Sequence, residues 1–243
     1  MTRMKAMILA AGRGERMRPL TDTCPKPLLK VGGKSLLLWH LERLKHAGFR
    51  QIIINHAWLG ALVEAALCVD APKNLGITYS PEREALESAG GIANALPLIT
   101  HNNRQNDEPF LVVNGDVWCD YDFARAASIA EQMMASGALA HLVMVPNPPQ
   151  HPAGDFALNA GRINDVATTT TTTKLTFSGI GVYRPALFNR VTPGAKAKLA
   201  PLLRQAMATR QVSGELFSGR WEDIGTPERL TALDAELSAA RPG

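Results

Sequence analysis

The sequence is poor in cysteine and has no long apolar run. Its 243 residues contain only three cysteines, Cys24, Cys68 and Cys119, at wide and irregular spacing. An odd number of cysteines without a paired spacing argues against a disulfide framework and against a zinc site. No apolar stretch approaches the ~20 residues that span a bilayer, and the N-terminus lacks the apolar region and cleavage site of a secretory signal. These features predict free thiols and a cytoplasmic location.

Other signatures are missing as well. The six histidines form no His-Glu-x-x-His motif and predict no metal site. The net charge is only +4 and the basic residues are dispersed without interleaved aromatics, so nucleic-acid binding is not indicated. No internal repeat is present, including the hexapeptide repeats of a β-helix. With 46% hydrophobic residues and no linker-like segment, residues 1–243 are expected to form a single domain around one large core.

Segments with strand character alternate with segments of helical periodicity. Strands are predicted at residues 7–10, 51–55, 77–80, 110–113, 138–145 and 175–183, and helices at residues 36–47, 58–67, 88–96, 123–134, 199–209 and 226–237. Residues 155–159 and 162–166 predict a hairpin, and the threonine tract at 168–173 predicts a loop. The alternation predicts an α/β fold with a mixed, mostly parallel sheet and helices on both faces. Functional side chains are then expected beyond the carboxyl ends of the strands.

The segment after the first strand is the most informative part of the chain. Residues 9–27 read Leu-Ala-Ala-Gly-Arg-Gly-Glu-Arg-Met-Arg-Pro-Leu-Thr-Asp-Thr-Cys-Pro-Lys-Pro. Glycines at the end of a strand leave backbone N–H groups free, and free amides beside Arg16 and Lys26 suit a polyphosphate. The segment is neither of the two better-known phosphate loops. Met17 replaces the third glycine of the dinucleotide fingerprint, and Leu28 replaces the first glycine of the P-loop motif.

Two aspartates are placed where a metal ion could meet such a loop. Asp116 directly follows the predicted strand at 110–113, and Asp223 precedes the predicted helix at 226–237. Chemistry on a nucleoside triphosphate generally requires Mg²⁺, which binds through one or two carboxylates plus substrate oxygens. Considered singly, each aspartate could instead form a turn or cap a helix. Together with the glycine-rich loop, they predict metal ligation.

These features resemble the signature of sugar-1-phosphate nucleotidyltransferases, which has a glycine-rich loop, an arginine, Pro-Leu-Thr and then Pro-Lys-Pro. The similarity covers nearly the whole chain and is greatest to uridylyltransferases that act on N-acetylmuramate 1-phosphate. The segments that carry it are residues 4–12, 54–60, 113–118, 120–124, 154–156, 175–180 and 198–203. Ala11 stands where the wider superfamily commonly has glycine, and alanine is normal in this subgroup. The resemblance implies a Rossmann-like nucleotidyltransferase fold.

The resemblance also implies a reaction. UTP and N-acetylmuramate 1-phosphate are expected to give UDP-N-acetylmuramate and pyrophosphate, a step of peptidoglycan recycling. A nucleotide-binding part is expected at about residues 1–115 and a sugar-binding part at about residues 116–243. The implied catalytic residues are Arg16, Lys26, Asp116 and Asp223, and the two aspartates are the implied Mg²⁺ ligands. The expected partners are UTP and a sugar 1-phosphate, bound by a monomer or small homo-oligomer without nucleic acid or membrane.

Further site residues follow from the same resemblance. Those implied for the nucleotide are Ala11, Gly12, Arg13, Gly14, Glu15, Arg16, Lys26, Glu82 and Ser88. Glu82 is a candidate acceptor for uracil N3–H, or else an ordinary surface glutamate. Those implied for the sugar are Asn114, Asp155, Ser178 and Gly179, although Asn114 could stabilise a turn and Asp155 could cap a strand. The Glu-Lys-Pro of the wider superfamily is absent, and Lys174 is either its substitute or an exposed lysine. A cation is expected to bind the lactyl carboxylate.

Three alternative functions remain at this point. The same chemistry could act on another sugar phosphate, such as a glucose or mannose 1-phosphate. A glycosyltransferase of similar fold would carry an Asp-x-Asp metal motif, and Asp120-Tyr121-Asp122 has that spacing. A non-catalytic nucleotide sensor would be expected to have lost at least one of the four catalytic residues, yet all four are present.

Overall fold

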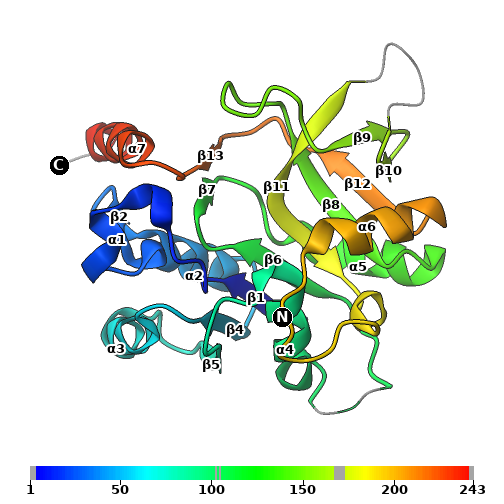
Figure 1. Ribbon diagram of the computed structural model, residues 1–243, viewed down its shortest axis with the longest axis horizontal. Helices are drawn as coiled ribbons and strands as arrows, with labels where there is room; N and C mark the ends of the chain where they lie inside the picture. Colours follow the sequence, from blue (N-terminus) through cyan, green and yellow to red (C-terminus); the bar gives the residue numbers. More distant parts are fainter. Residues whose placement is uncertain (1–3, 102, 104, 167–172, 241–243) are drawn as a thin grey trace.

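The computed structural model describes residues 4–101, 103, 105–166 and 173–240. A nine-stranded sheet forms its centre (Figure 1). β10 and β11 run against the direction of the other strands, so the predicted mixed, mostly parallel sheet is confirmed. In spatial order the strands are β5 (Gly76–Pro81), β4 (Gln51–His56), β1 (Ala6–Leu9), β6 (Phe110–Asn114), β11 (Lys174–Tyr183), β8 (Ala140–Val145), β12 (Val212–Leu216), β10 (Arg162–Asn164) and β9 (Phe156–Asn159).

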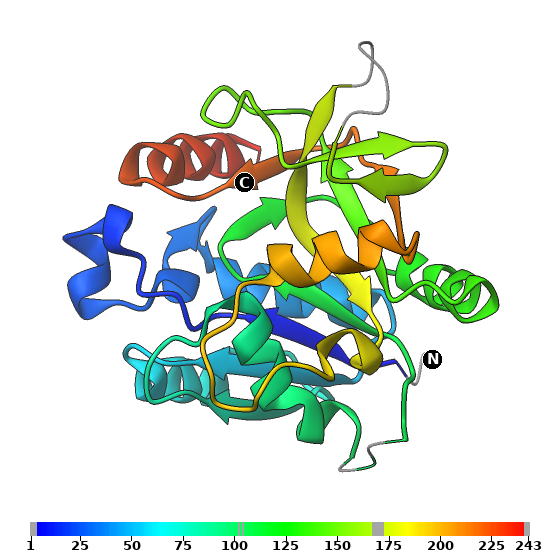
Figure 2. The same cartoon turned by 45° about the vertical axis from the view of Figure 1, so that its right-hand side comes forward.

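Helices cover both faces of the sheet (Figures 1 and 2). Ile8 of β1 packs in a core cluster with apolar residues of α2 (Leu36–His46), α3 (Gly60–Asp70) and α5 (Arg125–Ser136). Its neighbour Met7 packs in a second cluster with residues of α4 (Glu87–Ile99) and α6 (Leu199–Ala208). Successive side chains of a strand point to opposite faces, so the continuous apolar run of β1 supplies both layers.

A third, smaller cluster joins the beginning and the end of the chain. It contains Met17 and Val31 from the N-terminal part and Leu233 from the C-terminal helix α7 (Pro227–Ala239). Val31 lies in the hairpin of β2 (Lys30–Val31) and β3 (Lys34–Ser35), beside which α7 packs in both views (Figures 1 and 2). The Asp234 carboxylate also accepts a hydrogen bond of 2.7 Å from Gly32 N. The last helix is thereby anchored next to the glycine-rich loop.

Two of the helices begin at a side-chain N-cap. Ser35 Oγ accepts a hydrogen bond of 3.1 Å from Leu38 N at the start of α2. Thr226 Oγ1 accepts one of 3.4 Å from Arg229 N, with Pro227 at the first position of α7. Each cap satisfies a backbone donor that the helix itself leaves free, which explains why these helices begin where the sequence indicates.

Some elements differ from the sequence expectations. No sequence pattern predicted α1 (Leu20–Thr23), β12, the β2–β3 hairpin, or the pair formed by β7 (Val117–Cys119) and β13 (Trp221–Asp223). Most of these elements are too short to display a periodicity, and β12 includes Ser213 and Glu215. The threonine tract lies, up to residue 172, outside the described residues. No helix in the described part of the chain has the length and apolar character to cross a bilayer.

Candidate active site

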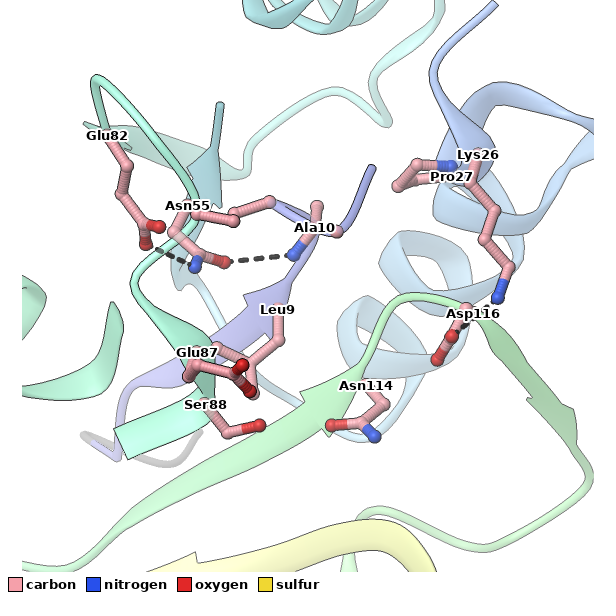
Figure 3. A pocket seen from close by; sticks show the side chains of 13 residues that line it. Leu9, Ala10, Lys26, Pro27, Asn55, Glu82, Glu87, Ser88, Asn114 and Asp116 are labelled. Atoms are coloured by element: carbon pink, nitrogen blue, oxygen red, sulfur yellow. Dashed lines mark hydrogen bonds and ion pairs between the residues drawn. The ribbon is translucent and has the colours of Figure 1, made fainter. Parts of the chain in front are cut away.

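A pocket of about 320 Å³ opens where β1, β4, β5 and β6 end (Figure 3). This is the carboxyl edge of the parallel strands, where an open α/β sheet is expected to bind its ligand. The residues that line it are Leu9, Ala10, Ala11, Gly12, Lys26, Pro27, Asn55, Glu82, Ala85, Glu87, Ser88, Asn114 and Asp116. The structure therefore brings together Ala11, Gly12, Lys26, Glu82 and Ser88 of the predicted nucleotide site.

A buried hydrogen-bond network, formed by the Asn55 and Glu82 side chains, lies in the wall of this pocket. Asn55 Oδ1 accepts a hydrogen bond of 2.9 Å from Ala10 N, and Asn55 Nδ2 donates one of 2.6 Å to Glu82 Oε1 (Figure 3). Glu82 Oε2 accepts one of 2.9 Å from Leu86 N. Burial raises the pKa of the Glu82 carboxyl, and the hydrogen bonds from Asn55 and Leu86 oppose that shift. Both carboxylate oxygens of Glu82 thus accept a hydrogen bond within the protein, and these bonds help to fix the shape of the pocket. The contact of Glu82 with uracil stays a prediction.

The hydrogen-bond network of Asn55 and Glu82 requires a glycine in the neighbouring helix. A Cβ at Gly91 of α4 would lie 2.7 Å from both Asn55 Nδ2 and Glu82 Oε1. Alanine is favoured over glycine in a helix by about 1 kcal/mol, but overpacking a filled interior costs about 1–3 kcal/mol. We expect Gly91→Ala to lower the free energy of unfolding by about 1 kcal/mol and to weaken UTP binding, as measured by urea denaturation and calorimetry. Gly76→Ala is the control, because a Cβ there would meet only Arg50 O, at 3.4 Å.

The glycine-rich loop is held by contacts within itself and to the turn that precedes α3. Gly14 has a φ of 67°, and a Cβ there would lie 3.0 Å from Thr21 Cγ2. Arg13 Nη1 donates to Thr21 O at 2.7 Å, and its guanidinium lies 4.0 Å from the centre of the Trp58 ring. These contacts fix Arg13 within the loop, and its contact with the nucleotide stays a prediction. Arg13, Gly14, Glu15 and Arg16 are not among the residues that line the pocket.

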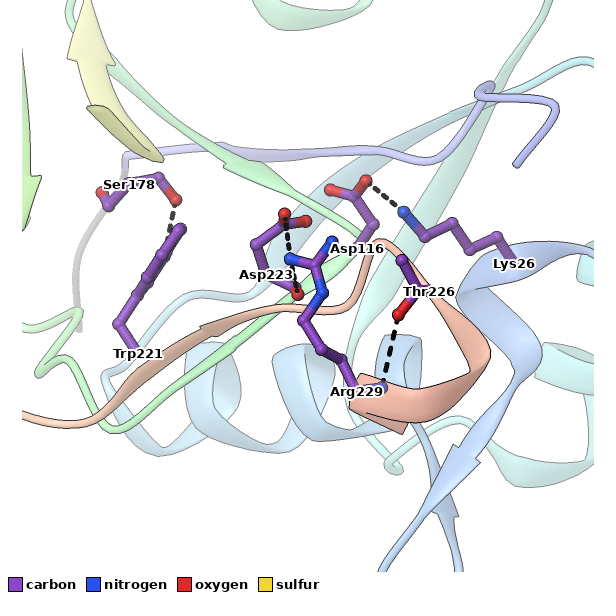
Figure 4. A network of polar contacts seen from close by, with 7 residues as sticks. All are labelled: Lys26, Asp116, Ser178, Trp221, Asp223, Thr226 and Arg229. Atoms are coloured by element: carbon purple, nitrogen blue, oxygen red, sulfur yellow. Dashed lines mark hydrogen bonds and ion pairs between the residues drawn. The ribbon is translucent and has the colours of Figure 1, made fainter. Parts of the chain in front are cut away.

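Lys26 is a buried cation at the edge of the pocket. It is 7% exposed, and its Nζ lies 2.6 Å from Asp116 Oδ2 (Figures 3 and 4). Asp116 comes directly after Gly115, whose N donates to Leu9 O at 2.8 Å, so the segment after β6 closes onto the end of β1. A Cβ at Gly115 would lie 2.8 Å from the same oxygen. The close approach of the two strand ends, rather than a positive φ, therefore requires the glycine.

A second pocket, of about 200 Å³, adjoins the first, and Asn114 and Asp116 line both. Ser178 and Gly179, which were expected to contact the sugar, are part of its wall. Gly179 has a φ of 79°, and a Cβ there would lie 2.7 Å from Asn114 Nδ2. The lining residues are Asn114, Asp116, Val117, Pro148, Gln150, His151, Thr176, Phe177, Ser178, Gly179, Trp221 and Asp223. Two ligands placed in the two pockets would meet at Asp116.

The short β7–β13 ladder brings the second aspartate to the same place. Asp223 lies opposite Val117 in this antiparallel pair, and Ile224 N donates to Asp116 O at 3.0 Å. Arg229 Nη1 donates to Asp223 Oδ2 at 2.7 Å and to Asp223 O at 2.9 Å (Figure 4). Arg16 is exposed, but its Nη2 and Asp223 Oδ2 would each lie 3.2 Å from a Cβ at Gly225. Lys26 thus lies beside Asp116 and Arg16 lies near Asp223, so the four predicted catalytic residues are close together.

Arg229 is expected to act through Asp223. A group that orients a metal-binding carboxylate typically contributes about 10-fold or more to activity or metal affinity. We expect Arg229→Met to lower kcat about 10-fold and to raise the Mg²⁺ concentration needed for half-maximal rate. Arg204→Met is the matched control, because Arg204 pairs with Asp165 at 2.9 Å outside both pockets. An unchanged Mg²⁺ requirement in Arg229→Met would contradict this role.

The donor set fits a hard cation better than zinc. Asp116 and Asp223 supply carboxylate oxygens, and no cluster of three or more His, Cys, Asp and Glu side chains suited to a metal occurs among residues 4–101, 103, 105–166 and 173–240. Mg²⁺ is commonly held by one or two carboxylates with substrate phosphates completing its shell. Lys26 and Arg229 form ion pairs with these two carboxylates.

The remaining predicted residues line neither pocket. Asp155 accepts a hydrogen bond of 2.8 Å from Phe177 N and pairs with His151, so it contacts the wall of the second pocket without lining it. Lys174 lines neither pocket. Asp122 of the Asp-x-Asp spacing is exposed and accepts a hydrogen bond from Ala124 N before α5. The structure thus provides no support for a metal at that motif.

Three site residues were missed from the sequence. Asn55 is a buried polar residue near the carboxyl end of an isoleucine-rich strand, and that pattern could have identified it. Arg229, in the first turn of α7, and His151, in the loop after β8, carry no local signal. His151 lies four residues before Asp155 and Arg229 lies six residues after Asp223, and each contact forms because the intervening turn brings the two side chains together.

The sequence and the fold are similar to those of known proteins. Residues 5–239 match the nucleotidyl transferase family. N-acetylmuramate alpha-1-phosphate uridylyltransferase of Neisseria meningitidis is 52% identical over 97% of this chain and 99% of its own. The catalytic subunit beta of Danio rerio mannose-1-phosphate guanylyltransferase is 30% identical over 98% of this chain and 66% of its own. The structure of a putative glucose-1-phosphate thymidylyltransferase from Bacillus anthracis superposes with a TM-score of 0.78 at 19% identity, covering 99% and 97% of the two chains. The chain belongs to the nucleotidyl transferase family.

Proposed function

We propose that the protein transfers the uridylyl group of UTP to N-acetylmuramate 1-phosphate, giving UDP-N-acetylmuramate and pyrophosphate. The observation that carries the proposal is the pair of adjoining pockets that share Asn114 and Asp116. The choice of nucleotide and sugar is supported by the 52% identity to the Neisseria meningitidis enzyme over nearly the full length of both chains. The reaction would serve peptidoglycan recycling in the cytoplasm, in a monomer or small homo-oligomer.

The first pocket would hold the nucleotide, and the second would hold the sugar. This assignment corresponds to a nucleotide part at about residues 1–115 and a sugar part at about residues 116–243. The amides of Gly12 and Gly14 and the Arg16 side chain would bind the β- and γ-phosphates of UTP. The Asn114 amide, held against Gly179, would donate to a sugar oxygen. The two ligands would then face each other across Lys26 and Asp116.

In the reaction, an oxygen of the sugar phosphate attacks the α-phosphorus of UTP in line. A new P–O bond forms, the bond from the α-phosphorus to its bridging oxygen breaks, and pyrophosphate leaves with that electron pair. A phosphate monoester is ionised near neutral pH, so no general base is needed. The task left to the protein is to position two anions that repel each other. Lys26 is suited to this task because a buried ammonium acts more strongly on phosphate oxygens than one in water.

Members of this family generally use a divalent metal, and Mg²⁺ is our proposal for this protein. Asp116 and Asp223 would hold it. Bound there, it would neutralise phosphate charge and align the reacting groups. Asp116 also forms an ion pair with Lys26, which places the ammonium beside the carboxylate that would hold the metal.

A substrate panel tests the proposed function. The protein is incubated with Mg²⁺, one of UTP, GTP or dTTP, and one sugar 1-phosphate, and pyrophosphate release is measured. We expect the highest kcat/KM for UTP with N-acetylmuramate 1-phosphate. A preference for GTP with mannose 1-phosphate would instead favour the activity named for the Danio rerio relative. Absence of pyrophosphate release with every pair would refute nucleotidyl transfer.

A further inference from the structure

The second pocket has an uneven distribution of ionisable groups. Of the described residues that line it, Asp116 and Asp223 are acidic, and His151 is the only one whose side chain can become cationic. The aspartates come from the ends of β6 and β13, whereas His151 comes from the loop between β8 and β9. An acceptor with a second anionic group besides its phosphate would be repelled by the aspartates and attracted by a protonated His151.

The imidazole of His151 is held in a defined orientation. Its Nε2 lies 3.1 Å from Asp155 Oδ1. Asp155 is itself fixed to β11, because its Oδ2 accepts a hydrogen bond of 2.8 Å from Phe177 N and its N donates one of 2.8 Å to Leu175 O. The structure gives no hydrogen-bond partner for His151 Nδ1 among the described residues, and the side chain is 42% exposed. One ring nitrogen is therefore anchored while the other remains available to a ligand.

The loop that carries His151 is also braced. Asn147 Oδ1 accepts a hydrogen bond of 2.9 Å from Thr176 Oγ1, and its Nδ2 donates one of 2.9 Å to Lys174 O. His151 N donates to Pro148 O at 2.9 Å. These contacts tie both the loop and Asp155 to β11, so the imidazole sits on a rigid support, as a group that discriminates between ligands requires.

N-acetylmuramate differs from N-acetylglucosamine only by a lactyl ether, which ends in a carboxylate. We propose that His151, oriented by Asp155, binds this carboxylate and thereby selects N-acetylmuramate 1-phosphate over N-acetylglucosamine 1-phosphate. The inference rests on the proposed function. With Nε2–H donated to Asp155, a protonated ring donates Nδ1–H to the lactyl carboxylate in a charge-assisted hydrogen bond. Asp155, which was expected to contact the sugar, acts through His151 instead.

The test compares the two sugar phosphates in His151→Ala. We expect kcat/KM for N-acetylmuramate 1-phosphate to fall about 30-fold, while kcat/KM for N-acetylglucosamine 1-phosphate stays within about twofold of the wild type. Asp155→Asn keeps a hydrogen-bond acceptor but loses the charge that orients the ring. It should give a smaller loss, again confined to N-acetylmuramate 1-phosphate. His46→Ala, an exposed position on α2 outside both pockets, is the matched control.

The outcomes separate the inference from the proposed function. An equal loss with both sugars, or no loss with either, would overturn the role of His151 while leaving the uridylyltransferase activity in place. Wild-type protein that does not use N-acetylmuramate 1-phosphate would overturn both. Calorimetric UTP binding by His151→Ala reports whether the variant is folded, because UTP would occupy the other pocket.

Discussion

Replacement of Asp116 by asparagine is expected to lower kcat at least about 1,000-fold, which corresponds to about 4 kcal/mol of transition-state stabilisation. Asp116 lines both pockets and contacts Lys26, so it lies where the two phosphates would meet. Asparagine keeps the size of the side chain and can still accept a hydrogen bond from Lys26, but it lacks the charge that holds a divalent cation. The fold should therefore persist, as checked by circular dichroism and thermal unfolding.

Asp122→Asn is the matched control for this variant. Asp122 belongs to the Asp-x-Asp spacing, but it is exposed and its Oδ1 accepts a hydrogen bond from Ala124 N. Asparagine can cap the chain in the same way, so activity close to that of the wild type is expected. The opposite pattern, with an active Asp116→Asn and an inactive Asp122→Asn, would move the metal site to the Asp-x-Asp motif and favour a glycosyltransferase.

Replacement of Lys26 by methionine is expected to lower kcat/KM by about 100- to 1,000-fold, an effect of the size seen when a single group that stabilises developing charge is removed. Methionine fills much of the same volume, and Lys26 is only 7% exposed, so the packing between Pro25 and Pro27 should survive. Asp116 would lose its partner at 2.6 Å but is partly exposed to water, which limits the loss of stability. Steady-state kinetics with UTP and the sugar phosphate varied in turn measure the effect.

Lys34→Met provides the comparison. Lys34 Nζ also lies 2.6 Å from a carboxylate, that of Glu42, but this ion pair is outside both pockets. Loss of a surface ion pair usually changes stability by less than about 1 kcal/mol, and activity should be unaffected. Equal activity of Lys26→Met and Lys34→Met would remove Lys26 from the catalytic residues.

Much of the fold could be predicted because it depends on local pattern. The apolar runs at residues 7–10 and 110–113 became the central strands β1 and β6, and the caps at Ser35 and Thr226 set the starts of α2 and α7. The β7–β13 pair could not be predicted in this way. Each strand has three residues, and their pairing depends on how distant parts of the chain pack.

The candidate site, like the fold, could be predicted only where it depends on residues that are adjacent in the sequence. Glycines, prolines and charges that are adjacent in sequence identified Lys26 and Asp116, and the structure joins them by an ion pair. The contacts that hold other side chains in place could not be predicted. Arg13 carries a charge beside two glycines, yet its stacking on Trp58 depends on where the turn between β4 and α3 packs. Arg229 lies only six residues after Asp223, but its contact with that carboxylate depends on how the chain turns between β13 and α7.

The most direct test of the account is a crystal structure of the protein with UDP-N-acetylmuramate and Mn²⁺, with the metal located by its anomalous signal. The account predicts one Mn²⁺ bound by the carboxylates of Asp116 and Asp223 and by phosphate oxygens of the ligand. It also predicts uracil in the first pocket and the N-acetylmuramate ring in the second. Mn²⁺ at Asp120 and Asp122, or uracil in the second pocket, would contradict it.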